Sequence, residues 1–70
     1  MAIETVLFGK RAVVKSVEDL KLFQRKQDLV AAATAMRAQP ENPVFHDIMS
    51  KIIRINRTIR ARGAFVQYME

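Results

Sequence analysis

The chain has 70 residues, carries a net charge of +5 and contains no cysteine. A folded monomer of this size buries only about 60% of the surface that its unfolded chain exposes. Because the sequence also excludes disulfides and thiolate metal sites, we expect one small domain that gains stability as a dimer or as part of an assembly.

The N-terminal segment, residues 1–15, is compatible with two structures. Two apolar runs flank Gly9 and Lys10, and glycine suits the first central position of a type II′ turn in a β-hairpin. That register places Glu4 opposite Lys15 and Val6 opposite Val13, which are favourable cross-strand pairs. The alternative is a short helix or an irregular arm that packs across the rest of the domain.

The first long helix is predicted over residues 17–38. Ser16 is a suitable N-cap, Asp19 three residues later approximates a capping box, and Glu18 adds negative charge to the first turn. Pro40 disfavours helical geometry at Gln39 and so ends this segment. The alanines of residues 31–35 would let a neighbouring helix approach closely.

The second helix is predicted over residues 43–62, with Asn42 as N-cap and Pro43 at the first helical position. Gly63 is suited to the left-handed residue that ends a helix. The tail, residues 64–70, is too apolar to be solvated, so we expect it to dock on the core or on a partner, and another helical turn could begin there. The short linker predicts an antiparallel αα-hairpin, and the fold class is therefore mainly α.

Apolar residues form a continuous stripe along the second helix, because their spacing alternates between three and four residues. We expect this stripe to pack on the first helix and to provide the surface for self-association or for a helical partner protein. Its residues are Phe45, Ile48, Ile52, Ile55 and Ile59, and Met49 widens it.

The same helix carries cations roughly every three residues, at Lys51, Arg54, Arg57, Arg60 and Arg62. Such residues could follow a nucleic-acid phosphate backbone, with Asn56 and Thr58 as further donors. The alternatives are a solvated face opposite the apolar stripe and a surface for an acidic protein. Few aromatic residues are present to stack on single strands, and no helix-turn-helix pattern occurs.

No catalytic pattern emerges from the sequence. His46 is the only histidine, and its neighbour Asp47 would point in a different direction on a helix. Glycine-rich phosphate loops and metal-ligand clusters are also missing. We therefore expect no enzyme activity, cofactor, metal or small-molecule substrate.

The turn Pro-Glu-Asn-Pro at residues 40–43, between alanine-rich and apolar helical sequence, resembles the helical hairpin of type III secretion needle subunits. The resemblance covers about half the chain and implies a subunit of a helical assembly. The cations of residues 54–62 and the Gly9-Lys10 segment depart from that family's pattern.

Three functions follow from these patterns. The first is a non-enzymatic protein-interaction module, regulatory or structural, that uses the apolar stripe. The second is a basic nucleic-acid-binding regulator, and the third is a needle-like subunit. The longest uncharged run, residues 29–36, is far shorter than the ~20 apolar residues that cross a bilayer, and no signal-peptide pattern is present. We therefore expect a cytoplasmic protein.

Overall fold

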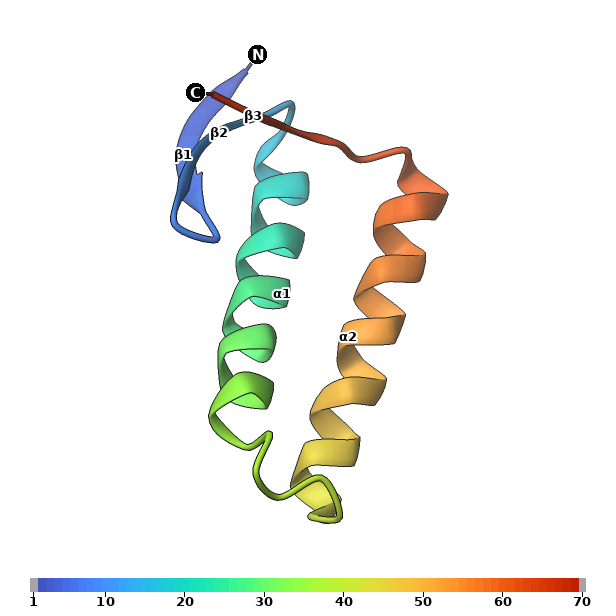
Figure 1. The fold of residues 1–70 in the computed structure, drawn as a ribbon. Coiled ribbons are helices and arrows are strands. Elements are labelled where there is room, and N and C mark those ends of the chain that lie inside the picture. The colour runs from blue at the N-terminus through green and yellow to red at the C-terminus, as the bar shows by residue number, and fades with distance from the viewer. Residues whose placement is uncertain (1, 70) are drawn as a thin grey trace.

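The computed structural model describes residues 2–69, which form two helices and one antiparallel sheet. The elements in chain order are β1 (Ile3–Leu7), β2 (Lys10–Val14), α1 (Val17–Ala35), α2 (Pro43–Arg62) and β3 (Val66–Tyr68). The helices run side by side, and the sheet lies at the end where α1 begins and α2 ends (Figure 1). The mainly helical fold with N-terminal strands agrees with the prediction. Within residues 2–69, neither helix is long and apolar enough to cross a membrane.

Helix α2 has the predicted bounds because both of its ends are capped. The side-chain Oδ1 of Asn42 accepts a hydrogen bond from the backbone N–H of Val44 at 2.9 Å, and Pro43 occupies the first helical position. Gly63 adopts the left-handed conformation, with φ of 64°, and its N–H donates to the carbonyl of Arg60. Together these residues fix where α2 begins and ends.

Helix α1 begins as predicted, with the hydroxyl of Ser16 accepting from the N–H of Asp19 at 3.1 Å. It ends at Ala35, however, three residues earlier than predicted. The N–H of Met36 already divides between the carbonyls of Ala32 and Ala33, and the chain continues as turns. This end has neither a glycine cap nor a basic residue in its last turn, so little favours extending the helix.

The N-terminal segment is a hairpin, but its turn differs from the predicted one. Phe8 and Gly9 are the central residues, both with positive φ (54° and 76°), as a type I′ turn requires. The register pairs Glu4 with Val13 and Val6 with Arg11, so the predicted pairing was wrong by two residues. A shift of two residues leaves the alternation of side chains unchanged, so the same side chains share each face of the hairpin in both registers.

Strand β3 was not predicted as a strand. It pairs with β2 in antiparallel register, with Ala12 opposite Tyr68 and Val14 opposite Val66. The tail therefore docks on the domain's own core, as expected in general terms, whereas the predicted helical turn was wrong. As a result, β2 is the central strand of the sheet.

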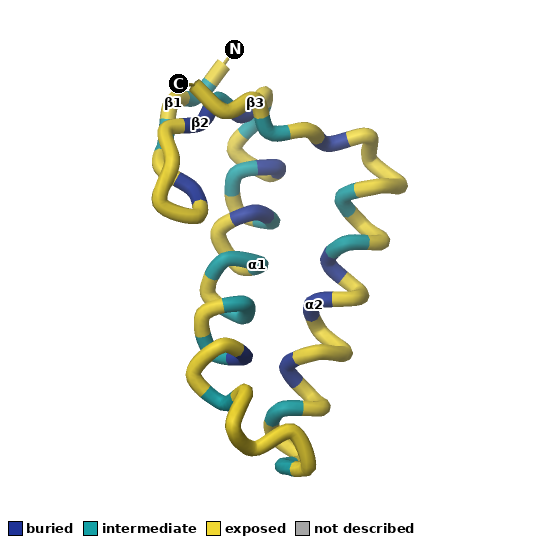
Figure 2. Tube along the Cα trace, viewed as in Figure 1, coloured by how far each residue is buried: buried dark blue, intermediate teal, exposed yellow. Residues whose placement is uncertain are grey.

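The core consists of two clusters, one at each end of the helices (Figure 2). Under the sheet, the fully buried Leu7 and Val14 pack with Phe23 of α1 and with Ala64. Towards the inter-helix loop, the second cluster contains only helical residues. Its buried members are Ala33, Ile48 and Ile52, with Leu29, Val30, Ala32, Met36 and Phe45 packed around them.

Candidate binding surfaces

The predicted apolar stripe of α2 faces α1. Ile48, Ile52 and Ile55 are buried, and Phe45 and Ile59 are half-buried. Of the six predicted residues only Met49 is classed as exposed, at 37%. The hairpin itself thus covers most of the surface that the sequence offered for a partner.

One side of the hairpin leaves an apolar depression between the helices. We call it the apolar groove, and it is lined by Val30, Ala33, Thr34, Arg37, Phe45, Met49 and Ile52. The sheet does not reach this half of the helices (Figure 1). Ile53, which is 50% exposed, follows Met49 by one helical turn and extends the apolar surface along α2.

A second depression continues along α2 towards the sheet. It is lined by Lys26, Asn56, Ile59, Arg60, Ala64 and Phe65. Phe65, at 71%, is the most exposed large apolar residue among residues 2–69. Neither this depression nor the apolar groove has a carboxylate among its lining residues.

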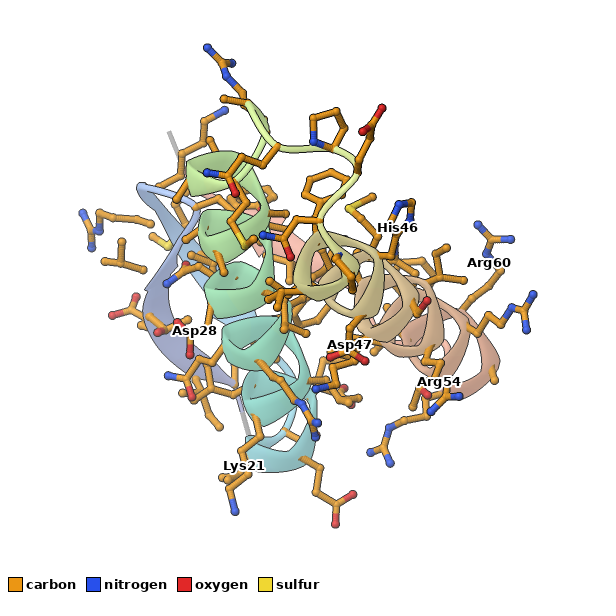
Figure 3. The ribbon with its side chains drawn as sticks, turned by 90° about the horizontal axis from the view of Figure 1, so that it is seen from below. Lys21, Asp28, His46, Asp47, Arg54 and Arg60 are labelled. Carbon is orange, nitrogen blue, oxygen red and sulfur yellow. The ribbon has the colours of Figure 1, made fainter. Side chains whose placement is uncertain are left out.

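The predicted cations of α2 do not form one surface. Figure 3 shows Arg54 and Arg60 pointing to different sides of the helix, with Arg54 on the side of Asp47 and of Lys21 from α1. Two hollows lie on that side, and because they share Leu22, Arg25 and Thr58 they form one elongated depression. We call it the basic groove. Its other lining residues are Glu18, Lys21, Lys51, Arg54, Ile55 and Arg62.

Two of the predicted cations are engaged within the chain. Lys51 pairs with Asp47 one turn away, with Nζ 3.0 Å from Oδ2. The guanidinium of Arg62 donates from Nη2 to Glu18 Oε2 at 2.9 Å and from Nε to Asp19 Oδ1 at 3.3 Å. The hydrogen bond to Glu18 raises the pKa of Arg62 above its ordinary value, and the bond to Asp19 acts in the same direction. Arg62 is therefore a structural cation.

Sequence reasoning missed two cations of the basic groove, Lys21 and Arg25, which come from α1. Lys21 lies one residue before Leu22 and Arg25 three residues after it, and Leu22 faces α2. Helical periodicity would therefore have placed both cations beside α2 if Leu22 had been assigned to the side of α1 that faces α2. Asn56 and Thr58, which were predicted as further donors to phosphate, also have other surroundings. Asn56 lies in the depression on the other side, and the hydroxyl of Thr58 donates to the carbonyl of Arg54 at 3.1 Å.

His46 and Asp47 diverge, as Figure 3 shows. The imidazole of His46 lies edge-on to Phe45, with 6.2 Å between ring centroids, whereas Asp47 pairs with Lys51. Across residues 2–69, no three histidine or carboxylate side chains are grouped so that they could hold a metal ion.

Comparison of the chain with known protein families, with curated proteins and with solved structures found no match.

Proposed function

We propose that this chain is a small, non-enzymatic cytoplasmic interaction module that binds an amphipathic helix with acidic flanks, presented by a partner protein. The apolar groove is the binding surface. The observation that carries the proposal is the combination of exposed apolar side chains with cations and without carboxylates along one side of the hairpin. A helix laid in such a groove buries its apolar side chains at helical spacing.

The large accessible surface area of the chain supports the proposal that a partner covers part of it. It amounts to 5395 Å², whereas a folded monomer of 8.0 kDa is expected to expose about 4,450 Å². The excess of roughly 900 Å² is close to the ~800 Å² that each partner buries in a protein interface of standard size. A docked helix would cover apolar surface that two helices alone leave open.

The cations along this side determine the chemistry of the partner. Arg37 lies in the apolar groove, and Lys26 and Arg60 lie in the depression that continues it. Within residues 2–69, none of the three takes part in an ion pair. Glutamates or aspartates that flank an apolar helix face would complement them, and basic flanks would be repelled.

A second copy of the chain is a poorer occupant. In this chain Glu18, Asp19 and Asp47 are engaged in ion pairs, Glu4 lies on the sheet, and the exposed Asp28 and Glu41 do not line the apolar groove or the depression that continues it. An isologous dimer through the apolar groove would instead bring the cations of both copies together. A dimer or larger assembly of the chain therefore stands as the competing outcome of the test.

The test uses two synthetic helical peptides that share an apolar face and differ only in having glutamate or lysine flanks. Fluorescence anisotropy should show that the glutamate peptide binds at least about tenfold more tightly, equivalent to about 1.4 kcal/mol. Met49→Ser with Ile53→Ser should weaken this binding, because Met49 lines the groove and the exposed Ile53, one helical turn later, extends its apolar surface. Val6→Ser, at an exposed apolar site on the sheet and away from the groove, is the control and should have no effect.

Three results would contradict the proposal. Equal affinity for the two peptides, or no binding of the glutamate peptide, would remove the charge argument. Sedimentation equilibrium provides the other test, because a dimer that Ile53→Ser dissociates would assign the apolar groove to a second copy.

A further inference from the structure

We propose that the basic groove is a second binding site, for the phosphate backbone of a nucleic-acid duplex. This site does not depend on the apolar groove. It also differs from the series of α2 cations that the sequence predicted as a phosphate-binding surface. The basic groove includes cations from both α1 and α2, and it does not include Arg60, which lines the depression on the other side.

Three cations along the basic groove are available for a ligand. Lys21 and Arg25 come from α1 and Arg54 from α2, and none of them takes part in an ion pair within residues 2–69. Glu18 is the one carboxylate among the residues that line the groove, and both Glu18 and Asp47, which lies one turn from Lys51, are paired with cations. Asp47 is held by Lys51, and Glu18 by Arg62.

The apolar floor of the groove strengthens the effect of these charges. Leu22 and Ile55 line the same hollow as Arg25 and Arg54, and Ile55 is buried. A hollow with low-dielectric walls and charges of one sign concentrates the electrostatic potential and attracts counter-ions. The arrangement therefore favours an extended anion that can contact both helices at once.

The geometry favours a duplex over a single strand. From Lys51 to Arg62, α2 rises by about 16 Å, which corresponds to about five phosphates along one strand of a duplex. None of the residues that line the groove is aromatic, so nothing is present on which unpaired bases could stack. Binding by cations alone contacts the backbone and gives little sequence preference.

The two proposed sites can be occupied together. The basic groove and the apolar groove open on opposite sides of the hairpin, as the divergence of Arg54 and Arg60 indicates (Figure 3). A protein helix on one side leaves the other side accessible. Failure of either proposal would therefore leave the other intact.

The experiment measures binding of short, mixed-sequence DNA and RNA duplexes by fluorescence anisotropy over a range of salt concentrations. With three phosphates neutralised, log Kobs against log salt should have a slope of about −2.7. Arg25→Gln with Arg54→Gln should reduce the steepness by about 1.8, because each lost phosphate contact contributes about 0.9. The DNA and RNA arms show which duplex is preferred.

A matched control separates a defined site from diffuse charge. Arg37→Gln with Arg60→Gln removes the same two charges from the opposite side, and its slope should stay near that of the unmodified chain. Asp47→Asn should steepen the slope by about 0.9, because it frees Lys51 for another phosphate.

Three outcomes would overturn the proposal. They are no duplex binding at low salt, the same loss from the control pair as from Arg25 and Arg54, and tighter binding of single strands than of duplexes. Circular dichroism of each variant shows whether it is folded, and the gain expected from Asp47→Asn cannot arise from misfolding.

Discussion

Arg62, the last residue of α2, donates a hydrogen bond from Nε to Oδ1 of Asp19 in the first turn of α1. This contact joins the helices at the end opposite their connecting loop. Because Asp19 is also the residue whose N–H is capped by Ser16, one short segment both starts α1 and anchors the end of α2.

The two carboxylates that bind Arg62 should differ in importance. The side chain of Asp19 is 12% exposed and that of Glu18 is 77% exposed, so solvent screens the Glu18 pair more strongly. We expect Asp19→Asn to lower the urea midpoint of unfolding more than Glu18→Gln does. In a background carrying Arg62→Gln this difference should shrink, and equal effects of the two single changes would contradict the assignment.

The cap of α1 should be measurable at Ser16. Ser16→Ala removes the hydroxyl that accepts from the N–H of Asp19, and we expect it to reduce the free energy of unfolding by about 1 kcal/mol. Ser50→Ala, at an exposed position inside α2, is the matched control and should be neutral or slightly stabilising. Urea denaturation followed by circular dichroism provides the measurement, and a loss at Ser50 as large as that at Ser16 would refute the capping role.

Backbone conformation, and not lack of space, should decide which residues position 63 tolerates in place of Gly63. A Cβ at this position would meet no atom within 4 Å, yet φ is +64°. We therefore expect Gly63→Ala to cost about 1 kcal/mol and Gly63→Asn to cost less, because asparagine tolerates the left-handed conformation. Thermal unfolding of both variants tests the order, and alanine matching glycine in stability would show that the helix ends differently.

Substitutions at two adjacent isoleucines of α2 should distinguish core packing from partner binding. Ile52 is 8% exposed and Ile53 is 50% exposed. We expect Ile52→Val to cost about 1 kcal/mol of folding free energy, whereas Ile53→Val should change stability by less than about 0.5 kcal/mol. Chemical denaturation gives both values. A larger loss at Ile53 would mean that this residue is covered in solution, as it would be in a dimer.

The helices illustrate where local sequence is sufficient. Both ends of α2 were predicted to the residue because Asn42, Pro43 and Gly63 act through backbone geometry in their immediate surroundings. The C-terminal end of α1 lacks such a residue, so its position depends on how the chain turns between Ala35 and Asn42. Periodicity alone could not locate it.

The sheet depends on contacts between distant residues. Phenylalanine is disfavoured at positive φ, so local preference did not place Phe8 in the turn. In the folded chain its N–H donates to Gln27 Oε1 at 2.7 Å, and the Nζ of Lys26 lies 6.0 Å from its ring centroid. Phe8 thus contacts two residues of α1 that are distant in the sequence, and local sequence preference could not predict this turn.

The binding surfaces were predictable in composition but not in arrangement. The alternation of isoleucines and cations on α2 is visible in the sequence, and it identified the residues that α2 buries, Ile48, Ile52 and Ile55. Whether a cation faces a groove, a carboxylate or solvent depends on the position of α1. Lys21 and Arg25 became relevant only once the two helices were placed together.

The position of β3 has a consequence for synthesis on the ribosome. Residues 66–68 pair with β2, which precedes them by more than fifty positions in the chain. Until β3 emerges, one side of β2 remains an unpaired edge that can recruit another extended chain. A nascent chain in which β2 has emerged and β3 has not is thus exposed to pairing with other chains, and β3 ends this exposure when it pairs with β2.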